Sequence, residues 1–521
     1  MTDSSTGSAG DAPAPIEGHG RGIRNGWLVV LAVAAVTRLV YASNKSLVLD
    51  EFHSYYHATA RGWDGLMARL LADNHPPLSF VVIGLSGSVL GLAEWALRLP
   101  AVVLGLLEIA AVASLAKGLS RRRNRASLAA IAAAALLSAS SLHFDYGTQA
   151  RMYAFLALFI TLATAALIAM MNRGQSPERS MVPPAIGFAL AAAAAFHTHY
   201  FAVQYLTALG FAFTVLAWIA KERRALRAFF GAAAGTAVLS APWALTGFRQ
   251  QLAHALPPGG DDVSISALAQ AFVQLFFHNI RFGGSIGRLA FIAGAALVLL
   301  VALRGVYVGL QARDLRGRLN SVGLLAVSAF VVPVLSWTLA LALPRAGFTW
   351  HYVLPSAAPV AILFAVGATD TEHRGQRIAL VAATLAWCLA AVLTGLHLLR
   401  PATEDFRGAV SFALQERAAA PSGEVTRIVS VEWQPALFPQ GQPYDYYAPR
   451  LSSAAPPERE PMLEGEFTVA SLERLKTADR VIVVRRSLPD GQHLLRHLAD
   501  WFPKKTVTEF GFGLDVRVFT R

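Results

Sequence analysis

Two adjacent carboxylates, Asp50 and Glu51, are the first residues in this sequence whose type and position could do chemistry. They follow a hydrophobic segment in the stretch SLVLDEFHSYYH, residues 46–57, and aromatic and histidine side chains crowd behind them. A carboxylate held near hydrocarbon has a raised pKa unless it is paired or hydrogen-bonded. Neighbouring side chains point about 100° apart on a helix, so the two acids are not expected to share one role. Either both are solvated acids in a loop, or the pair is functional.

A second feature is the stretch DNHPPLSF, residues 73–80, in which His75 precedes two prolines. The residue before a proline is pushed out of the helical region into an extended conformation. This fixes the direction of the His75 imidazole at the start of a hydrophobic run. The alternative is a helix-start signal that happens to contain a histidine.

Arginine and histidine side chains recur at the ends of later hydrophobic runs. Arg151 and Tyr153 lie at the mouth of one run, where an arginine either reaches for lipid headgroups or binds a phosphate with two parallel hydrogen bonds. The remaining candidates of this kind are His197 and His199 in FHTHY, and Arg345 and His351 in RAGFTWHY. The spacing of two between His197 and His199 can hold a divalent metal, and we keep them, with His53, as candidates for substrate or metal binding.

The elements that must position these residues are membrane-spanning helices. The chain has 521 residues, of which 55% are hydrophobic and 15% charged, and its mean hydropathy of +0.45 excludes an ordinary soluble domain. Apolar runs of about 20 residues, long enough to cross a bilayer, recur along the sequence. About twelve are predicted, near 27–43, 77–92, 95–117, 127–142, 152–171, 182–197, 201–220, 228–247, 287–310, 321–343, 353–369 and 377–398. Arg38, within the first run, is expected to face the protein interior.

The basic residues indicate the orientation of the chain. A net charge of +12 could suggest nucleic-acid binding, but the lysines and arginines cluster in alternate short loops, at 117–125, 173–179, 221–227, 313–318 and 374–377. The positive-inside rule places these loops in the cytoplasm, so Asp50 and the other candidates lie on the outer face. Because Asp50 is placed outside and the loop at 117–125 inside, an odd number of membrane crossings must separate them. Two apolar runs lie between them, which is an even number. Either the run at 77–92 is a half-span or a boundary is misplaced, and 11 or 13 crossings are expected in total.

Three parts of the chain are not simple spans. Residues 1–24 are predicted to form a disordered cytoplasmic tail before an uncleaved signal anchor. The first outer loop, 44–76, is expected to contain one or two interfacial helices broken near Gly62 and Gly65, and the second, 248–286, an amphipathic helix. Residues 401–521 are predicted to be a small extracytoplasmic α/β domain, with a helix at 402–418, strands at 425–431 and 481–484, and one or two strands at 506–519. The only cysteine, Cys388, lies in a predicted span, so no intrachain disulfide is possible.

Several motifs together give a resemblance to a known family. They are the Asp-Glu pair, HPPL at 75–78, GLAEWALRLP at 91–100, QARMY at 149–153 and HYVLP at 351–355. They resemble the polyprenyl-phosphate-sugar-dependent glycosyltransferases of the GT-C superfamily, in the branch of the protein O-mannosyltransferases and lipid A aminoarabinose transferases. The resemblance covers residues from about 27 to the last span, and the tail is similar to the small extracytoplasmic domain of bacterial members. It implies a polytopic helical membrane protein of the GT-C fold in a bacterial cytoplasmic membrane, with residues 25–400 as the transferase domain.

The resemblance also implies roles for the candidate residues. Asp50 corresponds to the catalytic base, with Glu51 supporting it or helping to bind the acceptor. The donor phosphate is expected to contact His75, Arg151, Tyr153, Arg345 and His351. Two positions depart from the family pattern, because His75 stands where the aminoarabinose branch has lysine, and His351 stands before Tyr352 where an arginine is common.

The expected reaction moves a sugar from a polyprenyl phosphate to a hydroxyl of a lipid, glycan or protein acceptor. One carboxylate that deprotonates the acceptor can suffice, because the phosphate is already a good leaving group, and in-line attack predicts inversion. No cofactor is required by this chemistry, although a divalent cation is one reading of the histidines, and no nucleic-acid partner is expected. The alternatives are a transporter or flippase of lipid-linked saccharide, which would place ionisable residues near the bilayer midplane, and a non-enzymatic assembly scaffold.

Overall fold

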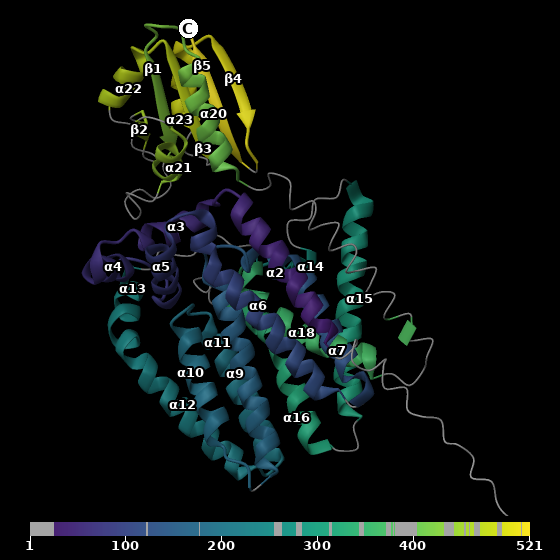
Figure 1. Cartoon of the computed structure of the whole chain (residues 1–521). Coiled ribbons are helices and arrows are strands. Elements are labelled where there is room, and N and C mark those ends of the chain that lie inside the picture. Colours follow the sequence, from purple (N-terminus) through teal and green to yellow (C-terminus); the bar gives the residue numbers. More distant parts are fainter. Residues whose placement is uncertain are drawn as a thin grey trace, which may run out of the picture.

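The structure of the chain is a computed structural model, and Figure 1 shows its arrangement. It describes residues 25–120, 123–176, 178–254, 263–277, 284–311, 315–342, 348–370, 377–378, 380, 404–431, 442–452, 455–457, 459–462, 469–486, 492–511 and 513–521. The predicted tail at 1–24, most of the predicted span at 377–398, Cys388 and Arg345 lie outside the described residues.

A helical bundle forms the larger part of the molecule. Among the described residues, eight helices are long and apolar enough to cross a membrane, which confirms a multi-pass membrane protein. These candidate spans are Gly26–Asn44, Glu94–Leu119, Tyr153–Gly174, Ala202–Ile219, Arg223–Leu252, Ile292–Leu310, Ser321–Ala342 and Trp350–Thr369. Shorter apolar helices are α5 (Leu78–Leu90), α7 (Ala126–Ala139), α10 (Val182–Phe196) and α14 (Ile265–Phe277).

The bundle combines long helices with short helical segments between them. The helices that make up the candidate spans are α2 (Gly26–Asn44), α6 (Glu94–Leu119), α9 (Tyr153–Gly174), α11 (Ala202–Ile219), α12 (Arg223–Trp243), α15 (Gly284–Leu310), α16 (Leu315–Ala326), α17 (Val332–Ala342) and α18 (Ala357–Thr369). The short ones are α3 (Leu49–Ala58), α4 (Gly62–Leu71), α8 (Ser141–Tyr146), α13 (Arg249–His254), the 3-10 turns Arg123–Arg125 and Trp350–Ser356, and the π-helical turns Ala244–Phe248 and Val327–Val331.

The centre of the bundle is formed by α18 and α9. Of the residues in the span that contains α18, 94% are buried, and in α9 78% are, whereas α2 and α12 reach only 17% and leave apolar side chains for lipid. Helices α15 and α18 approach closely, because a Cβ on Gly367 would lie 2.3 Å from the Val301 carbonyl oxygen. Glycine at such a crossing lets two backbones pack directly, as is common between membrane helices.

The position of α5 resolves the parity problem in the predicted orientation. Its 13 residues span about 20 Å, too short for the hydrocarbon core. The chain reaches α5 from the loop that contains His75, and just beyond its other end the Leu92 carbonyl accepts a hydrogen bond from Tyr446 of the C-terminal region at 2.7 Å. The far end of α5 therefore lies against the C-terminal region, and Figure 1 shows α3, α4 and α5 together on that side of the bundle. The short length of α5 and this contact support the interpretation of the run at 77–92 as a half-span.

The opposite side gathers the basic loops. Arg125 donates a hydrogen bond to the Thr369 carbonyl at 2.7 Å, which brings the loop after α6 beside the end of α18. Arg224 likewise donates to the carbonyl of Ser176 at 3.2 Å. These contacts place the three basic loops at 117–125, 173–179 and 221–227 at helix ends remote from α3, as the charge pattern predicts.

Helices α3 and α4 lie in the predicted first outer loop, and α14 in the predicted second, so helices form in both segments where the sequence patterns predict them. One detail was wrong, because Gly65 lies inside α4 and does not break it. Gly62 does mark a boundary, since it begins α4 with a φ of 68° that favours glycine. The buried side of α14 contains Leu268, Ala271 and Leu275, which pack on the bundle.

The C-terminal region folds as a sheet covered by helices. Its elements are α20 (Phe406–Ala418), β1 (Thr426–Val431), α21 (Pro443–Leu451), β2 (Arg459–Met462), α22 (Val469–Lys476), β3 (Arg480–Arg486), α23 (Gln492–Trp501), β4 (Lys504–Glu509) and β5 (Leu514–Thr520). The strand order is β2-β1-β3-β5-β4, with β1 parallel to β2 and β3, and β5 antiparallel to β3 and β4. The predicted helix and strands are confirmed, whereas β2 and three helices were not predicted.

Alternating side chains of β3 separate two layers of this region. Val481 and Val483 pack with α22 and α23, while Ile482 and Val484 face α20. The second layer continues into the membrane part, because Phe52 of α3 belongs to the same core and its ring lies 5.7 Å from that of Phe406. The helix that carries Asp50 therefore packs directly on the C-terminal region.

Arg38, His143 and Glu108 form a buried polar cluster within the bundle. Arg38 of α2 is fully buried, which confirms that it faces the protein, and its Nη2 donates to Nδ1 of His143 at 3.0 Å. Nε2 of His143 lies 3.2 Å from the carboxylate of Glu108, which also accepts a hydrogen bond from Thr161 at 3.0 Å. Glu108 lies 14 residues after Glu94 in α6, about 21 Å further along the helix. This group therefore departs from the expectation that the ionisable residues collect at the outer face.

Candidate active site

Asp50 is the second residue of α3, a position where the helix dipole favours a negative charge. Its side chain is exposed, whereas that of Glu51 is fully buried, so the two acids diverge as predicted from helix geometry. Desolvation by the surrounding protein acts to raise the Asp50 pKa. The positive charge of Arg151 is the largest opposing influence, and the pKa lies below the ordinary value. The result is an accessible carboxylate that stays ionised at neutral pH.

Glu51 is held by a complete set of hydrogen bonds. Oε1 accepts from Nε of Arg98 and from the backbone N–H of Ala150, both at 2.7 Å. Oε2 accepts from Nη2 of Arg98 at 2.5 Å and from the backbone N–H of Val48 at 2.9 Å. These four bonds use the lone-pair sites of the carboxylate, so the geometry favours support of α3 over binding of an acceptor.

Arg98 extends this clamp to neighbouring elements. It belongs to α6 and donates to the backbone carbonyls of Ala42, Lys45 and Ser46 at 3.1, 2.7 and 2.8 Å. A single guanidinium thus connects the end of α2, the start of α3 and the outer part of α6. Its planar fork of donors suits this bidentate pairing with Glu51.

Arg151 lies next to Asp50 and does not extend toward lipid. Its side chain is buried, and Nη1 donates to the Asp50 carbonyl at 3.1 Å and to Nδ1 of His53 at 3.0 Å. Nε is buried and has no hydrogen-bond partner among the described residues. A buried donor without a protein partner is costly, and a ligand oxygen could satisfy it.

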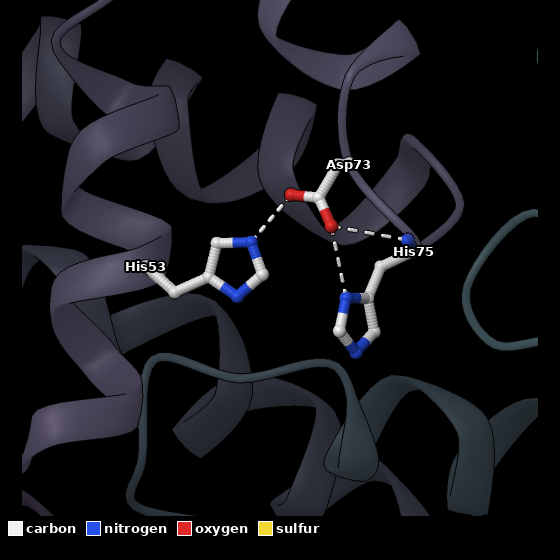
Figure 2. A group of neighbouring side chains, drawn as sticks. All are labelled: His53, Asp73 and His75. Carbon is white, nitrogen blue, oxygen red and sulfur yellow. Dashed lines mark hydrogen bonds and ion pairs between the residues drawn. The ribbon is translucent and has the colours of Figure 1, made fainter. Parts of the chain in front are cut away.

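Three histidines surround the carboxylate of Asp73, and Figure 2 shows two of them. Nε2 of His53 is hydrogen-bonded to Oδ2, and Nε2 of His57 lies 2.5 Å from the same oxygen. Nδ1 of His75 lies 3.0 Å from Oδ1, which also accepts the backbone N–H of His75 at 3.1 Å. The sequence patterns identified His53 and His75 as candidates, but not His57 or Asp73.

The tautomer of His53 follows from its two partners. Arg151 can only donate, so Nδ1 of His53 accepts, and Nε2 carries the proton and donates a hydrogen bond to Asp73. Burial lowers the His53 pKa to about 3, although Asp73 opposes this. The pKa of Asp73 lies well below its ordinary value, because its histidine partners outweigh the effect of burial. Asp73, His53 and Arg151 therefore form a hydrogen-bonded series that ends at the backbone of Asp50.

Aromatic rings complete the surroundings of Asp50. The ring of Tyr153 lies 5.0 Å from that of His351 and 5.9 Å from that of His199. His199 in turn lies 6.1 Å from His75, so the structure brings most of the predicted residues together. Burial lowers the pKa of His199 well below the ordinary value, so this imidazole is neutral.

His197 does not join this group, which corrects the predicted pairing with His199. Its Nε2 lies 3.3 Å from the Leu239 carbonyl of α12, while His199 faces Tyr153 and Tyr352. The chain turns between α10 and α11, so side chains at a spacing of two point to different neighbours. The two imidazoles therefore have different neighbours in this structure.

The C-terminal region contributes residues that the sequence did not identify. Oε2 of Glu404 accepts the backbone N–H of Leu49 at 2.8 Å, and its Oε1 pairs with Arg486 of β3 at 2.7 Å. The hydroxyl of Tyr447 accepts the backbone N–H of Leu47 at 2.7 Å. The start of α3 is thereby capped from another domain, a long-range contact with no local sequence signal. For His57 and Asp73 a signal was present, namely the i, i+4 spacing of His53 and His57 and the Asp-x-His order at 73–75.

Comparison with known proteins gives one family match. Residues 74–244, about a third of the chain, match the family model described as dolichyl-phosphate-mannose-protein mannosyltransferase. No match was found among curated proteins. The matched segment contains His75, Arg98 and Arg151, and ends at residue 244, just after α12.

Solved structures align with the chain at low identity. ArnT from Cupriavidus metallidurans in the apo state is 18% identical with a TM-score of 0.45, and 95% of this chain and 98% of that chain are covered. The apo oligosaccharyltransferase of Archaeoglobus fulgidus is 11% identical with a TM-score of 0.48, and 88% and 69% are covered. The Pmt1-Pmt2 complex of S. cerevisiae bound to the sugar donor is 15% identical with a TM-score of 0.33, and 46% and 34% are covered. Over residues 74–244 the family match bears out the predicted resemblance to the protein O-mannosyltransferase branch and the predicted enzyme class, a glycosyltransferase.

Proposed function

We propose that this protein transfers a sugar from a polyprenyl-phosphate donor to an acceptor hydroxyl, with Asp50 as the base. One observation carries the proposal: an accessible, ionised carboxylate lies beside a buried arginine that has an unpartnered Nε–H among the described residues. An acid to take a proton and a cation to receive a phosphate are the two groups this reaction needs. The name of the matched family, which contains dolichyl-phosphate-mannose, supports a donor of this chemical class.

The chemical step uses few protein groups. Asp50 accepts the proton of the acceptor hydroxyl as its oxygen bonds to the anomeric carbon. The bond from that carbon to the phosphate oxygen breaks, and the polyprenyl phosphate leaves with the electron pair. Attack opposite the leaving group inverts the anomeric centre.

The donor phosphate is assigned to the residues around Arg151. A guanidinium can bind two phosphate oxygens and stabilises the charge that develops on the leaving group. His75, Tyr153 and His351 lie in the same group of rings and can add hydrogen bonds to the phosphate or sugar, and Arg345 remains a further candidate. Glu51 is assigned to holding α3 in place.

The reaction is assigned to the outer face of a bacterial cytoplasmic membrane. The basic loops on the side remote from Asp50 support this orientation through the positive-inside rule. The C-terminal region, which contacts α3, then lies outside the cell. The acceptor is a hydroxyl of a lipid, a glycan or a protein.

A reconstituted assay tests the proposal. The purified chain, in nanodiscs, is given polyprenyl-phosphate sugars, and mass spectrometry follows loss of the donor and appearance of polyprenyl phosphate. Candidate donors and acceptors come from comparing lipid-linked sugars and envelope glycans of cells with and without the gene. Release of polyprenyl phosphate with a glycosylated product supports the transferase. Movement of intact lipid-linked sugar between leaflets, with no product, would instead support the transporter alternative.

A further inference from the structure

We propose that His53, Asp73 and His75 form a binding site for a divalent transition-metal cation such as Zn²⁺, with His57 as an adjacent ligand. One imidazole nitrogen from each of His53 and His75 and a carboxylate oxygen of Asp73 all lie within 4.8 Å of one another. Figure 2 shows the His53 and His75 rings each with a nitrogen turned toward the Asp73 carboxylate. Cation binding can be measured without any sugar transfer, so this inference does not depend on the proposed function.

The donor set and the spacing suit such an ion. Neutral imidazole and carboxylate are the usual protein ligands of zinc besides thiolate, at about 2.0 to 2.2 Å from the metal. Ligand atoms in a tetrahedral site are then roughly 3.3 Å apart. Nδ1 of His75 lies 3.0 Å from Oδ1 of Asp73, so an ion needs only small side-chain movements to enter.

The backbone around the cluster holds the ligands in place. His53 and His57 lie one turn apart on the same face of α3. Asp73 and His75 belong to the short loop before the two prolines that precede α5. Nε2 of Gln251 donates to the carbonyls of His75 at 2.9 Å and Leu70 at 2.7 Å, which holds this loop from the second outer segment.

Burial leaves one side of the cluster open. The side chains of His53, His57 and Asp73 expose 5%, 0% and 2% of their surface, while His75 exposes 21%. An ion can therefore enter past His75 and finds ligands that are otherwise shielded from water. The charges of Asp73 and of nearby Asp50 offset the positive charge of Arg151.

Cation binding competes with one contact of Arg151. In the hydrogen-bonded cluster, the Nε2–H of His53 donates a hydrogen bond to Asp73, and Nδ1 accepts one from Arg151 at 3.0 Å. When a cation binds Nε2, a neutral imidazole carries its proton on Nδ1, which can no longer accept. The hydrogen bond from Arg151 to His53 must open, so the arginine opposes the cation both by charge and by hydrogen bonding.

The experiment titrates the chelator-stripped full-length protein in detergent with Co²⁺, and the visible absorption of the bound ion reports the site. Zinc bound after dialysis is counted by elemental analysis. We expect one tightly bound ion per chain, and at least tenfold weaker binding in Asp73→Asn and His75→Gln. The amide introduced by His75→Gln can still donate a hydrogen bond to Asp73, so this variant separates loss of a ligand from loss of the fold. The matched control His197→Ala, a histidine on the same side but outside the cluster, should bind as the unaltered chain does.

A variant that is expected to bind the ion more tightly provides a second test. Arg151→Ala removes both the charge and the competing hydrogen bond, so we expect Co²⁺ to bind several-fold more tightly. Binding no stronger than background, or equal binding by His75→Gln and the His197→Ala control, would overturn the site. Weaker binding by Arg151→Ala, with an unchanged thermal midpoint, would overturn the competition with Arg151.

Discussion

Asp50 and Glu51 differ in environment because successive residues of a helix face different directions. Glu51 turns inward to Arg98 and Asp50 outward, beside Arg151. A buried carboxylate with all its hydrogen bonds made is a structural group, and an accessible one whose ionised form is stabilised can accept a proton. The burial of the two side chains therefore separates their roles more clearly than residue type does.

Glu51→Gln should destabilise the protein strongly. It leaves the Arg98 guanidinium buried and uncompensated, and breaking one side of a buried ion pair costs about 3 to 5 kcal/mol. The measurement is the thermal unfolding midpoint in detergent. The control is Glu94→Gln, which loses the more exposed pair with Arg407 and should cost about 1 kcal/mol or less. Equal small shifts for the two variants would contradict the clamp.

The buried histidines should make the stability depend on pH. His53 has a folded pKa of about 3, below its unfolded value of about 6.5, so the unfolded chain binds more protons between these two values. Stability is therefore expected to fall as pH drops from 6.5 toward 3. Asp73, whose folded pKa is depressed, adds a loss only below about 4.

Unfolding measured from pH 7 to 5 in the presence of chelator checks this. His53→Gln should reduce the slope by about 1.4 kcal/mol per pH unit, the linkage of one proton. His197→Gln serves as the control and should leave the slope unchanged. If the unfolding free energy of His53→Gln changes with pH as steeply as that of the unaltered chain, then the fold does not hold His53 neutral.

At the scale of elements, α3 depends on the C-terminal region. Glu404 and Tyr447 accept the backbone N–H groups of Leu49 and Leu47, which the helix itself cannot satisfy. Burial raises the pKa of Glu404, although Arg486 opposes this. The position of Asp50 is thus set by contacts between segments more than 350 residues apart in sequence.

Glu404→Ala should lower kcat for sugar transfer while the protein stays folded. Losing a helix cap costs about 1 kcal/mol, and a comparable loss at the transition state is about a fivefold to tenfold lower rate. The matched control is Glu416→Ala, which breaks a pair with Arg480 away from α3. A rate unchanged in Glu404→Ala would mean that the C-terminal region does not position Asp50.

Sequence patterns predicted the helices well because apolar runs of bilayer length and amphipathic spacing are local properties. The interfacial helices α3, α4 and α14 and the strands β1 and β3 follow from such patterns. The network between Asp73, His53 and Arg151 does not, since three segments must meet before it exists. The same holds for Arg98, whose partner Glu51 is 47 positions away, and for the half-span α5, which only the contact of Leu92 with Tyr446 reveals.

At the scale of the whole molecule, the orientation can be tested by labelling. In a Cys388→Ala background, Thr477→Cys places a thiol on an exposed position of the C-terminal region, and Glu178→Cys one in the basic loop at 173–179. A membrane-impermeant maleimide should label residue 477 in intact cells whose outer barrier is removed, and residue 178 only after permeabilisation. The reverse pattern would place Asp50 on the cytoplasmic face.

The most direct test of Asp50 as the base is sugar transfer by Asp50→Asn. Asparagine keeps the size of the side chain but cannot accept the proton, so transfer should fall about 10²- to 10⁴-fold, the usual contribution of a general base. The donor should still bind, because Arg151 is retained, and the thermal midpoint should be close to that of the unaltered chain. Transfer within a few-fold of the unaltered rate by a folded Asp50→Asn protein would contradict the assignment of Asp50 as the base.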